Sequence, residues 1–466
     1  MILPPEIEDL IASLRRQIAA LEAEVAELKR RLAQDSSTSS KPPSSDGLAK
    51  TPRIAGSLRE ASSKPSGGQK GHKGDTLRQM SEPDRIVRHE ASHCQHCLKP
   101  LEPGRAQDFE ARQVFDLVER PLAVTEHRAS LQRCGHCRGW TKAPFPAGVV
   151  SPAQYGERIK AAAIYLNVQQ LIPEDRAAEA LCDLFGAPAL CPASLTAWVR
   201  QKALDLERVY VGIGARVARE KVRHLDETGL RAAGRLHWLH TTSSAAFTFY
   251  RAEEKRGAIP SDLKGGVIVH DGFVPYGALG DVDHALCNAH HLRELKALIE
   301  IDGEAWAIPM RDMLRDANAA VSKARQAGAT ALAPGQVQAF EDQYWAAVRE
   351  GLAFHRALPK LARDPRSRGR LKHRPGFNLL ARFKTFKDDV LRFLVDFDVP
   401  FTNNLAEQDI RMTKVKMKIS GAFRTLAGAK TFACLRSIVS TARKQGCDIL
   451  QTLAVTPDQI SQALLA

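Results

Sequence analysis

Long apolar runs are missing from this 466-residue sequence. No stretch approaches the ~18 consecutive apolar residues of a membrane-spanning helix, so we expect no membrane association. The segment Met1–Glu6 lacks a basic region followed by an apolar core, so we expect no signal peptide and a cytoplasmic location. Cysteine is sparse and odd in number, at nine residues, which indicates metal sites and buried thiols instead of a disulfide framework.

Acidic residues are too few to balance the basic ones. Lys and Arg number 67 against 53 Asp and Glu, which leaves a net charge of +14 and favours a polyanionic partner. A hydrophobic fraction of 44% with 26% charged residues excludes wholesale disorder. The length predicts about three structural units.

An apolar seam follows the first 35 residues with alternating steps of three and four. Its members are Ile7, Ile11, Leu14, Ile18, Leu21, Val25, Leu28 and Leu32. Ile or Val at one core position and Leu at the other favours a parallel two-stranded coiled coil, and therefore a homodimer. A lone amphipathic helix packed on its own domain is the alternative. Residues 36–84 are rich in Ser, Gly, Lys and Arg and predict a flexible basic linker, either a phosphate-tracking arm or a plain tether.

Two C-x-x-C pairs lie within residues 85–150. They are Cys94 with Cys97, and Cys134 with Cys137. Two intervening residues let both thiolates of a pair reach one ion, and two such turns complete a tetrahedral site, which predicts a small β module holding a structural Zn²⁺. A redox role is the alternative. Three nearby histidines are alternate ligands or bystanders: His93, His96 and His136.

Residues 151–215 predict short helices. Pro173 and the acids after it begin one helix that ends at Gly186, and a second begins near Ser194. Two helices joined by a short turn predict a helix-turn-helix-like DNA-binding domain, with an ordinary helical subdomain as the alternative.

Near residue 216 the sequence pattern changes from helical to strand-like. Strand-like segments occur at 222–228, 236–240, 246–250, 266–272 and 285–291. Three antiparallel strands followed by parallel ones predict an RNase H-like α/β core. Asp226 and Asp271 stand at the ends of two of these strands, where carboxylates can bind a divalent ion such as Mg²⁺.

A third carboxylate is expected from a later helix. Thr402 or Asn403 can cap that helix and place Glu407 in its first turns. Helical spacing then puts basic side chains on the face of Glu407, at Arg411, Lys414 and Lys418. The segment 414–419 also alternates with period two, so a strand there is the alternative.

Motifs across nearly the whole chain resemble transposases of the insertion sequence 66 family, of the DDE type. They are the heptad start, Ser40–Asp46, Gly68–Gly74, the paired C-x-x-C turns, Asp226–Thr228, His270–Phe273, Cys287–His290, Pro400–Glu407 and Lys418–Arg424. The resemblance implies that Asp226, Asp271 and Glu407 are the catalytic triad. It also implies two Mg²⁺ or Mn²⁺ ions and DNA cleavage followed by strand transfer.

The resemblance carries further expectations. It implies a helical insertion at 300–395 and double-stranded DNA as partner, both as element ends and as target, at the nucleoid. It also implies small companion proteins of the same element. Cys287 and His290 resemble a C-x-x-H element, with a structural or a local metal or DNA role, and Asn403 and Asn404 are accessory candidates. Expected phosphate contacts are Arg411, Lys414, Lys416, Lys418 and Arg424.

The predicted fold is therefore a multidomain α+β chain. Its parts are a coiled coil (1–35), a linker (36–84), a zinc-binding β module (85–150), a helical domain (151–215), an RNase H-like core (216–299 and 396–445) around a helical insertion (300–395), and a helical tail (446–466). Two other functions stay open: a non-catalytic zinc-containing DNA-binding regulator, and an RNase H-like nuclease that cuts without joining.

Overall fold

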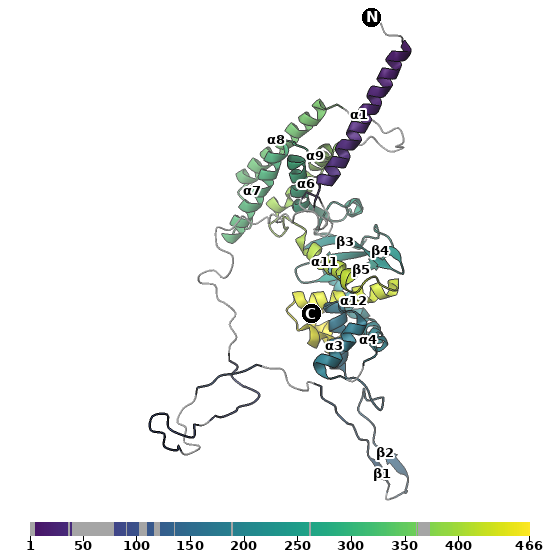
Figure 1. Cartoon of the computed structure of the whole chain (residues 1–466), viewed down its shortest axis with the longest axis vertical. Coiled ribbons are helices and arrows are strands. Elements are labelled where there is room, and N and C mark those ends of the chain that lie inside the picture. Colours follow the sequence, from purple (N-terminus) through teal and green to yellow (C-terminus); the bar gives the residue numbers. More distant parts are fainter. Residues whose placement is uncertain are drawn as a thin grey trace. The chain divides into compact units, whose positions relative to one another are not determined.

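The chain is described by a computed structural model, shown in Figure 1. The described residues are 5–35, 38–39, 79–89, 91–101, 110–115, 122–134, 136–187, 190–260, 262–359, 361 and 373–466. They fall into two compact units: residues 1–55 together with 131–466, and residues 56–130. Most of the expected linker, 36–84, lies outside the described residues. Among the helices that are described, none combines the length and apolarity needed to cross a bilayer.

The N-terminal heptads form one long helix, α1 (Pro5–Ala33). Seven of the eight seam residues are exposed, with exposed fractions from 42% at Ile7 to 75% at Leu32. The helix is confirmed, and the exposed seam leaves an apolar stripe for a second helix to cover. The coiled coil itself stays a prediction.

A chain without residues 1–35 is therefore expected to form smaller assemblies than the full chain, because the apolar seam would be lost. Analytical ultracentrifugation of both proteins measures this directly. Leu14→Asp with Leu21→Asp in the full chain is the matched test, since it keeps the length and breaks only the seam. An unchanged mass in both proteins would contradict a coiled-coil dimer.

The larger sheet has five strands. These are β3 (Val222–Ala232), β4 (Arg235–Ser243), β5 (Thr248–Glu253), β6 (Val267–His270) and β7 (Asp283–Leu286). Their order is β5-β4-β3-β6-β7, with β3, β4 and β5 antiparallel and β3, β6 and β7 parallel. The expected change from antiparallel to parallel strands is present, and the mixed composition is α+β.

Helices precede, follow and interrupt the sheet (Figure 1). Before it lie α2 (Glu157–Ile164), the π-helical turn Tyr165–Gln169, α3 (Glu174–Phe185), α4 (Pro192–Asp205) and α5 (Glu207–Ala218). After it lie α6 (Asn288–Glu300), α7 (Ala307–Gln326), α8 (Pro334–Ala357), α9 (Pro375–Thr385) and α10 (Lys387–Val395). The chain then forms α11 (Asn404–Ile419), α12 (Leu426–Lys444), α13 (Ile449–Ala454) and α14 (Pro457–Leu465). Val274–Ala278 is a 3₁₀ turn.

The predicted boundaries of α3 are confirmed. Pro173 precedes the first turn, and Gly186 ends the helix with a left-handed φ of 67°, which glycine adopts without strain. The following helix begins at Pro192, with proline at its first position.

The helix α11 continues through Ile419, so the strand alternative for 414–419 is wrong. The buried residues of α11 are Ala406, Ile410 and Thr413. Their spacing of four and three is helical, and it packs one stripe of the helix against the protein. This burial outweighs the two-residue alternation of Lys and apolar residues.

The hydrophobic core is shared by distant parts of the sequence. One cluster joins α2 and α5 to β3–β5, α12 and α14, with members such as Ile213, Leu239, Ile438 and Leu464. A second cluster holds α6 to α10 together around Trp306, Leu380 and Phe383. Helix α11 packs against β3 and β4, and α12 packs against β5, α4 and α5. These contacts fix the position of α11 and of its side chains.

Candidate active site

Two parallel strands bring Asp226 and Asp271 together. β3 and β6 pair in register with Val222 opposite Val267 and His224 opposite Val269. Continuing the same register by two residues places Asp226 opposite Asp271. The turn after β6 is fixed by the Phe273 N–H, which donates to Asp271 Oδ1 at 2.9 Å. The two aspartates thus lie side by side, Asp271 directly after the end of β6 and Asp226 in the middle of β3, so the expectation that Asp226 ends its strand is wrong.

The first turn of α11 brings Glu407 to the same place. Burial, followed by the negative charges of Asp271, Glu227 and Glu407, raises the pKa of Asp226 to about 8, against a hydrogen bond from the Glu227 N–H that lowers it. Each of these charges acts on Asp226 because the carboxylates converge. Arg293 lies 3.9 Å from Glu407, but among the described residues no Lys or Arg forms an ion pair with Asp226 or Asp271, and a bound divalent ion would relieve their charge.

Asp226 and its neighbour Glu227 have different environments, because successive strand side chains point to opposite faces. Glu227 Oε1 accepts from Arg256 at 2.7 Å, and Glu227 Oε2 accepts from the Tyr276 hydroxyl at 2.6 Å. The Arg256 guanidinium also lies 4.2 Å from the Phe273 ring centre. Glu227 is therefore committed to a structural cluster, and Asp226 is the acid of this pair that is available for a metal ion.

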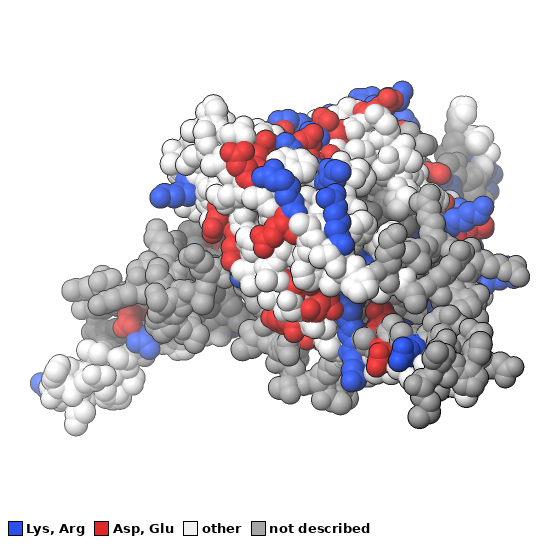
Figure 2. Space-filling model, turned by 90° about the horizontal axis from the view of Figure 1, so that it is seen from above, with Lys and Arg blue, Asp and Glu red and all other residues white. Residues whose placement is uncertain are grey.

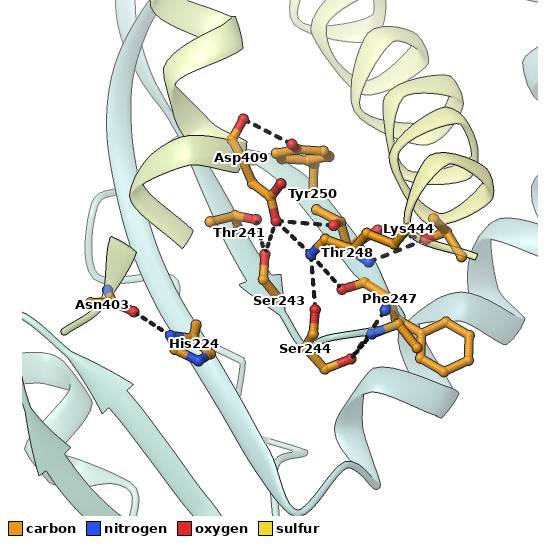
Figure 3. Close-up of polar contacts among 12 residues, drawn as sticks. His224, Thr241, Ser243, Ser244, Phe247, Thr248, Tyr250, Asn403, Asp409 and Lys444 are labelled. Atoms are coloured by element: carbon orange, nitrogen blue, oxygen red, sulfur yellow. Dashed lines mark hydrogen bonds and ion pairs between the residues drawn. The ribbon is translucent and has the colours of Figure 1, made fainter. Parts of the chain in front are cut away.

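Asn403 fastens the start of α11 to β3. It occupies the N-cap position, but its side chain makes no capping bond to the helix. Its Nδ2 donates to the Leu225 carbonyl at 2.7 Å, and His224 Nδ1 donates to its Oδ1 at 2.9 Å (Figure 3). Burial lowers the pKa of His224 to about 4, so the ring is neutral and can serve as a fixed donor. Asn403 thus sets the position of Glu407 relative to Asp226.

A second anchor holds α11 two residues after Glu407. Asp409 Oδ2 accepts from Ser243 Oγ at 2.6 Å, Thr248 Oγ1 at 3.0 Å and Lys444 Nζ at 2.8 Å (Figure 3). The Tyr250 hydroxyl donates to the Asp409 carbonyl at 2.9 Å. Burial lowers the pKa of Lys444, and Asp409 opposes that shift. This cluster joins α11 to β4, β5 and α12.

Sequence reasoning missed the Asp409 cluster. The run of small hydroxyl residues, Thr241–Ser244, in an otherwise buried strand was the available signal, because buried hydroxyls need partners. The clamp by Glu227, Arg256 and Tyr276 was also missed.

The basic residues of α11 separate into two groups. Arg411, Lys414 and Lys418 are exposed, and Arg424 is exposed beyond the end of the helix. Lys416 differs, since its ammonium lies 4.1 Å from the Phe423 ring centre and burial lowers its pKa. Lys416 is therefore engaged with an aromatic ring. On the face drawn in Figure 2, blue and red residues are interspersed, and the basic excess forms no single patch there.

Cys287 and His290 lie beside Glu407. Cys287 is buried at the start of α6, and its Sγ is 3.9 Å from Glu407 Oε1. His290 Nδ1 is also 3.9 Å from Glu407 Oε1. Asn404, the first residue of α11, is exposed.

The two C-x-x-C turns belong to different units, and each has the same local geometry. Cys94 N–H donates to Lys99 at 2.9 Å, and Cys134 N–H donates to Gly139 at 2.8 Å. The second turn joins two antiparallel strands, β1 (Leu131–Arg133) and β2 (Trp140–Lys142). Backbone hydrogen bonds from Cys97 and Cys137 lower the pKa of Cys94 and Cys134, respectively, which favours the thiolates that metal ions require.

Two family models match the chain. The model described as Transposase IS66 family matches residues 152–431, which include β3, β6 and α11. A family of unknown function (DUF6444) matches residues 2–78. No curated protein matches the chain. Because the first model covers more than half of the chain and all three converging carboxylates, the chain belongs to the IS66 family of transposases.

Proposed function

We propose that the chain is a DDE transposase with an RNase H-like core that cuts DNA at the ends of its element and joins the freed ends to target DNA. Asp226, Asp271 and Glu407 are its catalytic carboxylates. The observation that carries the proposal is the convergence of these acids: two meet through the β3–β6 register, and the raised pKa of Asp226 responds to the other two.

The donor set fits a hard divalent ion. All three side chains offer carboxylate oxygens, the ligands that Mg²⁺ and Mn²⁺ prefer, and three carboxylates leave positions for phosphate oxygens and water. When bound, two such ions would lower the pKa of the attacking water or 3′-hydroxyl and neutralise charge at the scissile phosphate.

The chain's own residues hold and orient the reacting groups. Asn403 and Asp409 fix α11 on either side of Glu407 and so hold its carboxylate near the two aspartates, where a bound ion would draw the three together. Arg411, Lys414 and Lys418 lie on the exposed face of the same helix and would contact DNA phosphates, with Arg424 beyond it. Lys416, held on Phe423, contributes less to this surface than its position in the sequence implies.

Three further features complete the proposal. The cysteines of the C-x-x-C turns are ligands of structural Zn²⁺, for which the matched geometry of each turn and the lowered thiol pKa are the support. The exposed seam of α1 pairs two chains. The chain acts at the nucleoid, with small companion proteins of the element as further partners.

The test is a strand-transfer assay with purified full-length chain and Mg²⁺. The substrates are a labelled duplex from the end of its own element and a supercoiled plasmid. Label joined to the plasmid is the expected result. Cutting without joining would favour a nuclease, and specific end binding without any cutting would favour a DNA-binding regulator.

A further inference from the structure

A second set of potential ligands, of different chemistry, lies beside the acidic triad. Cys287 Sγ, His290 Nδ1 and a Glu407 oxygen all lie within 4.8 Å of one another. Two of these separations, both to Glu407 Oε1, are 3.9 Å. Two elements supply the three groups, since Cys287 and His290 sit at the start of α6 and Glu407 in the first turn of α11.

The spacing fits a tetrahedral ion with little movement. Bond lengths of about 2.3 Å to sulfur and about 2.0–2.2 Å to nitrogen or oxygen place tetrahedral ligand atoms roughly 3.4–3.6 Å apart. The two 3.9 Å separations exceed that by only a few tenths of an ångström. A fourth ligand position would be left for water or a phosphate oxygen.

The ring nitrogen of His290 that lies nearest Glu407, Nδ1, makes no hydrogen bond to the described residues. This nitrogen is also buried. A buried ring nitrogen without a partner is costly, and a metal ion would satisfy it. The nearest charged groups besides Glu407 include Arg293, whose Nη2 lies 3.9 Å from Glu407 Oε2 and leaves Oε1 facing Cys287 and His290.

The cysteine is surrounded by donors that suit a thiolate. The Asn403 N–H donates to Cys287 Sγ at 3.1 Å. Burial and the negative charge of Glu407 raise the pKa of the Cys287 thiol to about 12, against the N–H groups of Asn403, His290 and Ala289, which lower it. A bound metal would take the place of the thiol proton, which leaves to solvent as the sulfur–metal bond forms.

We propose that Cys287, His290 and Glu407 form a site for one transition-metal ion of the Zn²⁺ class, separate in its chemistry from the all-carboxylate site. Thiolate and imidazole select such ions, whereas Mg²⁺ is bound by oxygen alone. Glu407 belongs to both sets. If the proposed function holds, an ion in this site withdraws Glu407 from Asp226 and Asp271, so transition metals of this class oppose Mg²⁺-dependent chemistry.

Cobalt is the probe, because Co²⁺ bound to a thiolate in tetrahedral geometry absorbs in the near ultraviolet and the visible. Full-length chain freed of metal by a chelator is titrated with Co²⁺ and compared with Cys287→Ser, so that any cobalt held by the C-x-x-C turns is common to both proteins. The expected result is an absorption band of about one equivalent in wild type that Cys287→Ser lacks. Cys434→Ser is the matched control, since Cys434 is also buried but its Sγ faces the Ala203 carbonyl in α4.

His290→Gln guards against a folding defect in the serine variant. It keeps Cys287 and should retain a thiolate band with affinity for Co²⁺ reduced roughly tenfold or more. Equal bands in wild type and Cys287→Ser, or undiminished affinity in a folded His290→Gln, would overturn the proposal. The spectrum needs no DNA, so a chain that binds Co²⁺ here but joins no DNA would refute only the proposed function.

Discussion

Asp226→Asn is expected to reduce DNA joining on the order of 10³-fold while leaving binding to the element end unchanged. The substitution keeps the size of the side chain but removes one of the three negative charges that would hold the divalent ions. The proposed phosphate-binding face of α11 is untouched. Strand-transfer assays measure the chemistry, and gel-shift titrations without Mg²⁺ measure the binding.

Asp262→Asn is the matched control. Asp262 is exposed, lies outside the strands, and its substitution removes the same charge from the chain. It should retain full joining activity. Wild-type joining by Asp226→Asn, or loss of joining in both variants, would contradict the assignment of the triad.

Asp226→Asn should also change how the stability of the chain depends on pH. The pKa of Asp226 is raised from 3.8 to about 8 in the fold, so folding takes up a proton between these values. Stability from this group is therefore lost as pH rises from about 4 towards 8. In Mg²⁺-free buffer, Asp226→Asn should gain thermal stability relative to wild type over that range. A difference that is constant with pH would contradict the raised pKa.

Asp409→Ala is expected to destabilise the chain by about 3–5 kcal/mol, because it leaves Lys444 partly buried without its carboxylate. The hydroxyls of Ser243 and Thr248 lose the same acceptor. The side chains of the Asp409–Lys444 pair are only 16% and 13% exposed, so water cannot fully replace the lost contacts. Thermal unfolding followed by circular dichroism should show a midpoint lower by about 5–10 °C.

Glu157→Ala is the comparison for this experiment. It removes an ion pair with Lys160 whose glutamate is 67% exposed, and such pairs contribute ~0–1 kcal/mol. Asp409→Asn should fall between the two, since it keeps an acceptor oxygen and loses the charge. If Asp409→Ala and Glu157→Ala had equal midpoints, the Asp409 cluster would carry no stability.

Local sequence signals predicted most of the elements. Periodicity and turn chemistry report on residues that are neighbours in the sequence. Such residues determine the seam of α1, the Pro173 and Gly186 boundaries of α3, and the apolar strand before Asp271. The segment 414–419 fitted both periods, and only the burial of Ile410 and Thr413 decides for the helix.

The site was predictable to the same extent. Asp226, Asp271 and Glu407 were predicted from expected strand ends, a helix start and the family resemblance; Asp271 and Glu407 lie near enough to act on the pKa of Asp226, and their joint catalytic role stays a prediction. The supporting contacts were not predictable, because Asp409 and Lys444 are 35 residues apart and Asn403 and Leu225 are 178 apart. Pairing over such distances depends on how the elements pack, and no local pattern records it.

The shared core has a consequence for how the protein is made. Ile213 of α5 and Leu464 of α14 are buried in one cluster, and Arg216 donates to the Leu465 carbonyl. At roughly 5–20 residues per second, translation reaches α14 some tens of seconds after α5. The apolar face of α5 that packs on α14 stays uncovered for that time. The core of a nascent chain is therefore incomplete until α14 has been synthesised. A stop codon a dozen residues early would remove α14 and expose the apolar face of α5, and such a product is expected to be a substrate for proteolysis.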